Sequence, residues 1–245
     1  MKRCLTKRRK AKRTLLRLME RTRYQHPGAR PSYTARLPRR LQLSGSRSMS
    51  KQKLALLASG RGSHLTNLFQ AIERGDILAD IGLVVSDVEG SGAAQFAGAK
   101  GIPLLLVSAE HASSAIARNQ RILEALTLHA IDWVLCLGYL KKVGTTIVEQ
   151  YAGKMINIHP SLLPKFGGRG MYGLNVHRAV IDAGESVSGA TVHYVNEAYD
   201  EGAIIAQATV DVPSGATPED LAALVLKAEH ALLITTLKRL IDHHD

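Results

Sequence analysis

Cysteine is nearly absent from this 245-residue chain, which contains only Cys4 and Cys136. Cys4 lies in a basic N-terminal stretch and Cys136 lies inside an apolar run, so the two thiols form no spaced pattern. A disulfide framework and a paired-cysteine metal motif are therefore both excluded. We expect the protein to work in a reducing compartment.

The sequence also lacks a run of about 18 uncharged apolar residues, which a membrane-spanning helix requires. Its N-terminus lacks the apolar stretch of about 7 to 15 residues that marks a secretory signal. These absences argue against a secreted protein and against a membrane-spanning one. The 45% content of hydrophobic residues is enough for the core of one large or two small domains.

Acidic residues are almost missing from residues 1–50, where 16 Lys and Arg accompany a single acid, Glu20. Residues 51–245 contain 16 Lys and Arg and 20 acids, so the two parts carry charges of +15 and −4. The net charge of +11 therefore describes the leader and not the body. Such a start is typical of a nucleic-acid-binding arm, an organelle transit peptide or an extension translated from an upstream start codon.

Met49 favours the last two of these interpretations, because it opens the segment "MSKQKLALLASG" like a natural start just before the first strand. Residues 1–50 also show no sustained apolar period. We predict a disordered leader over 1–50 and one folded domain over 51–245. The expected location is the cytoplasm, or an organelle if the leader is a transit peptide.

Short apolar runs alternate with helical patterns from residue 53 onward. Between the first two runs, apolar residues recur at i, i+3, i+4 and i+7 from Leu65 to Ile72, and Gly75 ends the pattern, which predicts an amphipathic helix. The expected strands, apolar throughout as strands buried on both faces are, lie at 53–58, 81–85, 103–107, 132–137 and 155–158. This alternation predicts an α/β fold with a doubly wound, mostly parallel sheet.

The last third of the chain has a different pattern. The segments 190–195 and 203–212 are typical of strands, and the turn-like "NEAYDEG" between them predicts an antiparallel pair. A long helical pattern follows, with Thr217 as its N-cap and Pro218 at the first helical position. We therefore expect a closing helix after the strand pair.

The first strand runs into "SGRGSHLTN", where Gly60 and Gly62 allow a tight turn. Because ligands of such folds bind at the carboxyl ends of parallel strands, the amides of Gly62, Ser63 and His64 at a helix N-terminus are candidate phosphate donors. No Gly-Lys-Ser/Thr follows, so this is not a Walker loop. The alternative is a glycine turn that only connects the strand to the helix.

The fourth strand ends in "GYLKKVG", residues 138–144. Gly138 allows the close approach of a ligand or of another backbone segment. Leu140 and Val143 are candidates for the walls of a flat apolar pocket. The alternative is an ordinary loop whose lysines are solvated.

The fifth strand ends in "INIHPSLLP", which places Asn157 and His159 two residues apart and so on one face of the strand. Pro160 stops ladder pairing directly after His159, and Pro164 keeps the following loop irregular. A lone histidine is more often structural than catalytic. An asparagine beside it at strand spacing, with a conformational stop, favours a catalytic pair.

An asparagine and a histidine together suit attack on a carbonyl-like carbon. The amide of Asn157 can donate to a developing oxyanion, and the imidazole of His159 can carry the proton that moves. A carboxylate beside the imidazole would orient it and favour its charged form. The turn after residue 195 supplies three candidates, Glu197, Asp200 and Glu201, and the residues alone do not choose among them.

Five motifs in this order resemble the folate-dependent formyltransferases, and among them the glycinamide ribonucleotide formyltransferase branch. They are "LLASGRGSHLTNL", "LCLGYLKKV", "INIHPSLLPKF", "GATVHYVNEAYDEGAIIAQ" and "AEHALL". The resemblance covers residues 53 to 242. It implies a Rossmann-like formyltransferase fold, a catalytic domain over 51–245, and transfer of a formyl group from 10-formyltetrahydrofolate to the amine of phosphoribosylglycinamide in purine biosynthesis.

The resemblance also implies the roles of the catalytic residues. His159 is implied as the acid/base, Asn157 as a hydrogen-bond donor to the formyl oxygen, and Asp200 as the carboxylate that raises the pKa of His159 and orders a water. Asp200 is thereby selected from the three acids of the turn.

The binding sites follow from the resemblance in the same way. Gly62, Ser63 and His64 are implied to hold the substrate phosphate, and Glu229 to reach the ribose hydroxyls. The implied folate-binding residues are Leu140, Lys141, Lys142 and Val143, together with Asn157. The implied partners are small-molecule substrates, without a metal, nucleic acid or membrane, and the implied protein is a monomer or homodimer.

The chain departs from the common pattern of this family at three places. His64 stands where asparagine is usual, Ala203 stands where proline is common, and the stretch "FGGRGMYGLNVHRAV", residues 166–180, is longer than typical. Arg118 is near the position of a folate-site arginine but does not align with it.

Three rival functions are weighed against this resemblance. Methionyl-tRNA formyltransferase normally carries a further C-terminal domain, and formyltetrahydrofolate deformylase a regulatory domain ahead of the catalytic one. A nucleotide-binding or basic-arm nucleic-acid-binding protein would use Asp87, at the end of the second strand, as a ribose acceptor.

Overall fold

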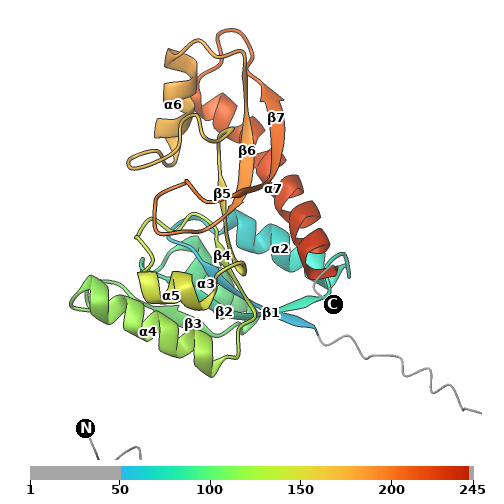
Figure 1. Ribbon diagram of the computed structural model, residues 1–245. Helices are drawn as coiled ribbons and strands as arrows, with labels where there is room; N and C mark the ends of the chain where they lie inside the picture. Colours follow the sequence, from blue (N-terminus) through green and yellow to red (C-terminus); the bar gives the residue numbers. More distant parts are fainter. Residues whose placement is uncertain (1–50, 243–245) are drawn as a thin grey trace, which may run out of the picture. The chain divides into compact units, whose positions relative to one another are not determined.

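A seven-stranded sheet organises residues 51–242, the part of the chain that the computed structural model describes (Figure 1). The leader, residues 1–50, for which we predict disorder, lies outside the described residues. The strands are β1 Gln52–Leu57, β2 Ala79–Ser86, β3 Leu104–Leu106, β4 Trp133–Cys136, β5 Met155–His159, β6 Val187–Tyr194 and β7 Ile204–Asp211. Their order in the sheet is β3-β2-β1-β4-β5-β6-β7.

The sheet is mixed. The five strands from β3 to β5 run parallel, while β6 pairs antiparallel with β5 and β7 pairs antiparallel with β6. The chain therefore winds outward from β1 in both directions, because β1 lies between β2 and β4. This topology confirms the predicted doubly wound, mostly parallel sheet with an antiparallel pair near its C-terminal end.

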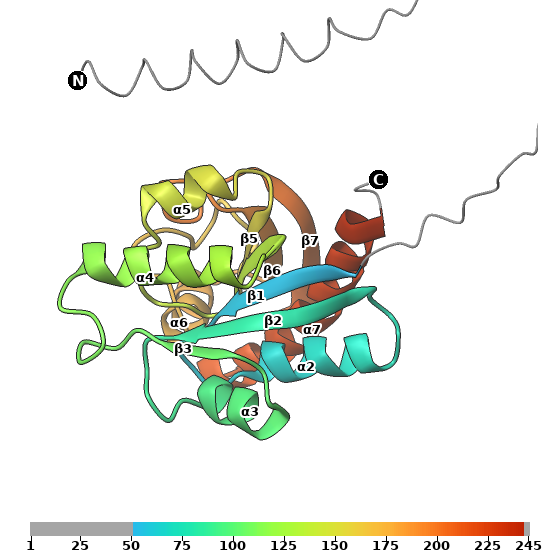
Figure 2. The same cartoon turned by 90° about the horizontal axis from the view of Figure 1, so that it is seen from below.

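Helices cover both faces of the sheet. They are α2 Ser63–Glu73, α3 Gly92–Lys100, α4 Ala115–Leu128, α5 Thr145–Gln150, α6 Leu174–Asp182 and α7 Pro218–Asp242. Figure 2 shows α4 and α5 over one face and α2, α3 and α7 over the other. None of the helices between residues 51 and 242 has both the length and the apolar character needed to cross a membrane.

Each parallel strand contributes side chains to two separate hydrophobic cores, one on each face of the sheet, because successive side chains point in opposite directions. In β1, Leu54 and Leu56 join the core under α2 and α7, whereas Ala55 and Leu57 join the core under α4 and α5. All four are fully buried. This explains why the strand sequences are apolar throughout rather than alternating.

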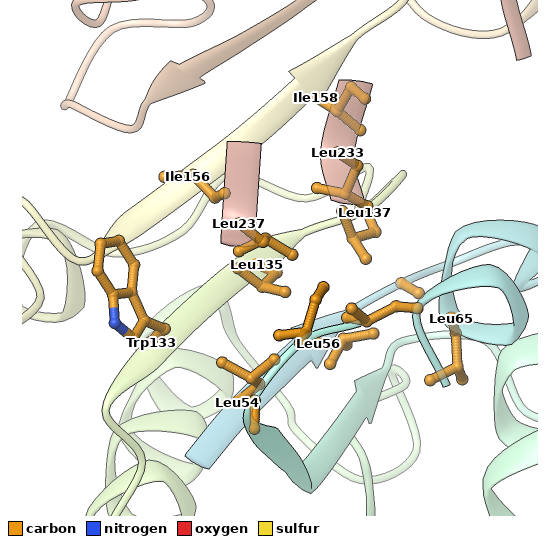
Figure 3. Packing of buried hydrophobic residues seen from close by; sticks show 14 of the residues in the cluster. Leu54, Leu56, Leu65, Trp133, Leu135, Leu137, Ile156, Ile158, Leu233 and Leu237 are labelled. Atoms are coloured by element: carbon orange, nitrogen blue, oxygen red, sulfur yellow. The ribbon is translucent and has the colours of Figure 1, made fainter. Parts of the chain in front are cut away.

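The closing helix α7 is part of this core and not an accessory. Its residues Leu233 and Leu237 are fully buried, and Figure 3 shows them beside Ile156 and Leu135 of the central strands. The predicted N-cap is present, because Thr217 Oγ1 accepts a hydrogen bond from the Asp220 amide at 3.1 Å. Asp220 in turn accepts from the Thr217 amide at 3.0 Å, which completes a capping box.

Candidate active site

The ends of three parallel strands are tied together by one serine. Ser59, two residues after β1, donates a hydrogen bond to Asp87 Oδ1 at 2.5 Å, and its Oγ accepts from the Leu140 amide at 3.1 Å. The loops that follow β1, β2 and β4 are thereby fixed at the edge where such folds bind ligands. Asp87, the ribose acceptor of the rival interpretation, accepts from this serine through Oδ1.

The loop that carries Gly60 and Gly62 leads from β1 to α2. Gly62 is the residue directly before α2, and its φ is 78°. A Cβ at this position would lie 2.8 Å from Ala93 Cα, so the turn accepts only glycine. The first backbone bond of the helix runs from the Thr66 amide to the Gly62 carbonyl at 2.9 Å. The amides of Ser63 and His64 precede it and lie in the first turn, where helices bind anions.

Glu229 of α7 lies beside this helix start. Its Oε1 is 3.7 Å from His64 Nε2, and the ring of His64 meets the ring of His230 edge-on with centroids 4.9 Å apart. Burial, and then the neighbouring His230, lower the pKa of His64 to about 4. Burial raises the pKa of Glu229 to about 8.

Asn157 lies on β5 directly opposite His193 of β6 in the antiparallel ladder. Its Nδ2 is 3.0 Å from His193 Nε2, and His193 Nδ1 is 2.9 Å from the Tyr194 carbonyl. Because a carbonyl only accepts, His193 Nδ1 donates to it, and in the tautomer that carries its hydrogen at Nδ1 the Nε2 atom accepts from the amide of Asn157. His193 therefore fixes the orientation of Asn157.

His159, two residues further along β5, is buried. Its Nε2 lies 2.8 Å from the Phe166 carbonyl and donates to it, which leaves Nδ1 facing Asp200 Oδ2 at 3.5 Å. Burial lowers the pKa of His159, although the Asp200 carboxylate and the Phe166 carbonyl act in the opposite direction. The ring is therefore neutral at pH 7 and can take a proton at Nδ1, beside the carboxylate.

Asp200 links these side chains. Its Oδ2 accepts from the Gly168 amide at 2.9 Å, and its Oδ1 lies 3.4 Å from Asn157 Nδ2 and 3.6 Å from His193 Nε2. Burial by itself raises the pKa of this carboxyl, but the two histidines and the Gly168 amide together bring the pKa below its ordinary value. Asp200 is therefore ionised at neutral pH.

Two residues near this carboxylate have a left-handed backbone. Asp200 has a φ of 58° and Phe166 a φ of 56°. Asp200 holds the carboxylate, and Phe166 supplies the carbonyl that accepts from His159. Non-glycine residues in this conformation cluster at functional sites, because the surrounding structure must hold them there.

A pocket opens beside these groups. Lys142 and Tyr199 face each other there, with the ammonium 5.9 Å from the ring centroid. The pocket is lined by Cys136, Tyr139, Lys141, Lys142, Val143, Asn157, His193, Val195, Asn196, Glu197, Ala198, Tyr199 and Asp200. His159 and Leu140 are not among the lining residues, and the side chain of Leu140 is exposed.

The structure thus brings Asn157, His159 and Asp200 together, as the sequence resemblance implied. Asp200, and not Glu197 or Glu201, is the acid of the turn within reach of the imidazole. Sequence reasoning missed His193, although a histidine inside the apolar segment "ATVHYV" was a usable signal. It also missed the backbone groups of the loop after β5, which no side-chain pattern reports.

The described residues hold no group of three or more His, Cys, Asp or Glu side chains arranged for a metal ion.

Comparison with known proteins places this chain in a family. The formyl transferase family model matches residues 52–237. The chain belongs to the formyl transferase family.

Individual formyl transferases match over most of the described chain. The phosphoribosylglycinamide formyltransferase of Bacillus subtilis is 34% identical over 190 residues, which are 78% of this chain and 95% of that protein. The chloroplastic phosphoribosylglycinamide formyltransferase of Arabidopsis thaliana is 39% identical over 185 residues, 75% of this chain. This match spans 63% of the length of the plant relative.

A solved structure agrees with the sequence matches. Glycinamide ribonucleotide transformylase 1 from Geobacillus kaustophilus superposes with a TM-score of 0.73 at 36% identity, covering 78% of this chain and 99% of that one.

Proposed function

We propose that this chain is a phosphoribosylglycinamide formyltransferase. It transfers the formyl group of 10-formyltetrahydrofolate to the amine of phosphoribosylglycinamide, a step of purine biosynthesis. The observation that carries the proposal is the junction of Asn157, His159 and Asp200 at the end of β5, beside a pocket that Asn157 and Asp200 line. The names of the similar proteins support the same reaction.

Each of the three side chains has a distinct task. Asn157 uses one amide hydrogen to bind His193 at 3.0 Å, while the other faces Asp200 at a longer 3.4 Å. A formyl oxygen on that side can share the second hydrogen with Asp200 as negative charge builds on it, without any turn of the amide. Asp200 stays ionised and stabilises His159 when that ring takes a proton at Nδ1.

The pocket fits a flat heterocycle with polar edges. Val143 and Val195 offer apolar walls, and the segment 196–200 presents backbone and polar atoms along one side. When bound, the folate co-substrate supplies the activated formyl group. Lys141, Lys142 and Val143 would hold its ring system, with Asn157 at the reacting end.

Phosphoribosylglycinamide, the second substrate, would bind at the N-terminus of α2. The amides of Gly62, Ser63 and His64 would bind its phosphate, and the Glu229 carboxyl would bind its ribose hydroxyls. A small-molecule substrate pair needs no nucleic acid or membrane, and a monomer or homodimer is the expected assembly. The cytoplasm stays the predicted location, or an organelle such as the plastid named for the Arabidopsis relative if residues 1–50 act as a transit peptide.

The test is a formyl-transfer assay of the full chain with 10-formyltetrahydrofolate, with and without phosphoribosylglycinamide. Tetrahydrofolate release that requires phosphoribosylglycinamide supports the proposal, whereas equal release without it indicates a deformylase. Asn157→Ala removes one oxyanion donor and should lower kcat by about a hundredfold or more. The exposed His111 provides a matched control, since His111→Ala should leave kcat unchanged.

A further inference from the structure

Three ionisable side chains meet where the first turn of α2 packs against α7, two helices that lie side by side (Figures 1 and 2). His64 comes from α2, and Glu229 and His230 come from α7. Asn67, one turn after His64, donates from Nδ2 to the His230 carbonyl at 3.1 Å and fixes the two helices in register. The three side chains therefore have a defined mutual geometry.

These groups are buried without adequate partners. Glu229 is 7% exposed, and its carboxyl makes no hydrogen bond to any residue between 51 and 242. Within the same range, Nδ1 of His64 and Nε2 of His230 are buried without hydrogen-bond partners. Burying unpaired polar groups costs free energy, so this arrangement suits a ligand that supplies the missing partners.

We propose that Glu229 and His64 form a proton-transfer pair that responds to the substrate phosphate. Without phosphate the proton resides on the Glu229 carboxyl, and with phosphate bound it moves to His64. The O–H bond of the carboxyl breaks, an N–H bond forms at His64 Nε2, and the net charge of the pair stays zero. This inference rests on the proposed function, because it takes the phosphate of that substrate as the ligand.

The geometry assigns each nitrogen of His64 a role. Nε2 faces the Glu229 carboxyl at 3.7 Å and accepts the proton, so Nδ1 carries the hydrogen of the neutral ring. Nδ1 is the atom left without a partner. In the charged ring it donates a charge-assisted hydrogen bond to a phosphate oxygen, alongside the first-turn amides of α2.

The resting state is neutral because both groups are buried. The pKa of His64 is lowered to about 4 and that of Glu229 is raised to about 8, so near pH 7 the carboxyl holds the proton. A phosphate dianion beside His64 reverses this preference by stabilising the imidazolium. His230 stays neutral, because a second positive charge edge-on to His64 would repel the first.

The transfer couples two parts of substrate recognition. Once Glu229 has lost its proton, its carboxylate only accepts hydrogen bonds and is ready for the ribose hydroxyls. Binding of the phosphate thus creates the acceptor for the sugar. A ribose without phosphate meets a protonated carboxyl, and we expect its affinity to be at least tenfold lower for loss of the charge-assisted bonds.

The first experiment is ¹⁵N NMR of the full chain with labelled histidine near pH 7. The probe is D-ribose 5-phosphate, D-ribose is its control, and His64→Asn assigns the resonance of His64. The phosphate should convert His64 from a neutral ring to an imidazolium, and ribose should not. A neutral His64 in protein saturated with D-ribose 5-phosphate would overturn the proposal.

The second experiment is calorimetry of the same binding in two buffers of different ionisation enthalpy. Wild-type binding heat should be independent of the buffer, since the proton comes from Glu229. In Glu229→Gln the proton must come from solvent, so the heat should depend on the buffer and the affinity should fall about tenfold. The control is Glu219→Gln, an exposed acid on the same helix, which should behave as wild type.

If the wild type took up one proton from the buffer on binding D-ribose 5-phosphate, the result would contradict proton transfer from Glu229 to His64. Failure to bind D-ribose 5-phosphate would contradict both the pair and the phosphate subsite. The formyl-transfer assay decides the function separately, because catalysis can persist while His64 stays neutral.

Discussion

Replacing Asp200 by asparagine tests the catalytic site with the least change of shape. Asparagine tolerates the left-handed backbone at this position, and its side-chain oxygen can still accept from the Gly168 amide. What is lost is one negative charge 3.5 Å from His159 Nδ1. The side chains of Asp200 and His159 are only 12% and 5% exposed, so solvent screening is limited.

The expected loss follows from the separation of the two charges. At an effective dielectric constant near 20, opposite charges at about this distance attract by roughly 4 kcal/mol. The attraction exists only while His159 holds the extra proton, so it lowers the barrier and not the energy of the resting state. Its removal should reduce kcat by roughly a thousandfold.

The assay is formyl transfer as a function of pH. Since the carboxylate raises the pKa of His159 against the effect of burial, its removal lowers that pKa further. The acid limb of kcat/KM should therefore move to lower pH in Asp200→Asn. Asp211→Asn, at an exposed strand end, is the control. A kcat within tenfold of wild type, or an unmoved acid limb, would refute this account of Asp200.

Three further predictions concern stability, each measured by urea unfolding. A Cβ on Gly202 would lie 1.7 Å from the Tyr194 carbonyl oxygen, so Gly202→Ala should lower the free energy of unfolding by about 3 kcal/mol. Gly98 in α3 has open space around it, so Gly98→Ala should leave the free energy of unfolding unchanged or raise it by up to about 1 kcal/mol. Leu237→Ala empties a fully buried site and should cost about 2–5 kcal/mol. Burial raises the pKa of Glu229 from 4.5 to about 8, so the folded state keeps a proton that the unfolded state releases. The stability difference between wild type and Glu229→Gln should therefore fall by about 1.4 kcal/mol for each unit that the pH rises across that window. Parallel pH profiles for the two proteins would contradict the burial effect.

The parts of the site that could be predicted from the sequence are those set by local periodicity. Asn157 and His159 share a face because strand side chains alternate, and the position of Gly62 before α2 follows from the turn that a glycine allows. The order of short apolar runs and helical patterns was enough to predict the sheet, because parallel strands need helical crossovers.

What sequence reasoning could not supply depends on neighbours far apart in the chain. His193 reaches Asn157 only through the antiparallel register of β5 and β6. Leu140 was expected at the pocket wall, but its amide is bound to Ser59 and its side chain points to solvent. Such outcomes depend on loop paths that only the packed fold determines.

The loop after β5 reaches the catalytic side chains through main-chain atoms. The carbonyl of Phe166 accepts from His159, and the amide of Gly168 donates to Asp200. Both bonds depend on the path of the backbone, and at Gly168, with a φ of 92°, that path favours glycine. Side chains elsewhere on this loop can therefore change during evolution, altering what the enzyme admits, while the two bonds to His159 and Asp200 stay the same.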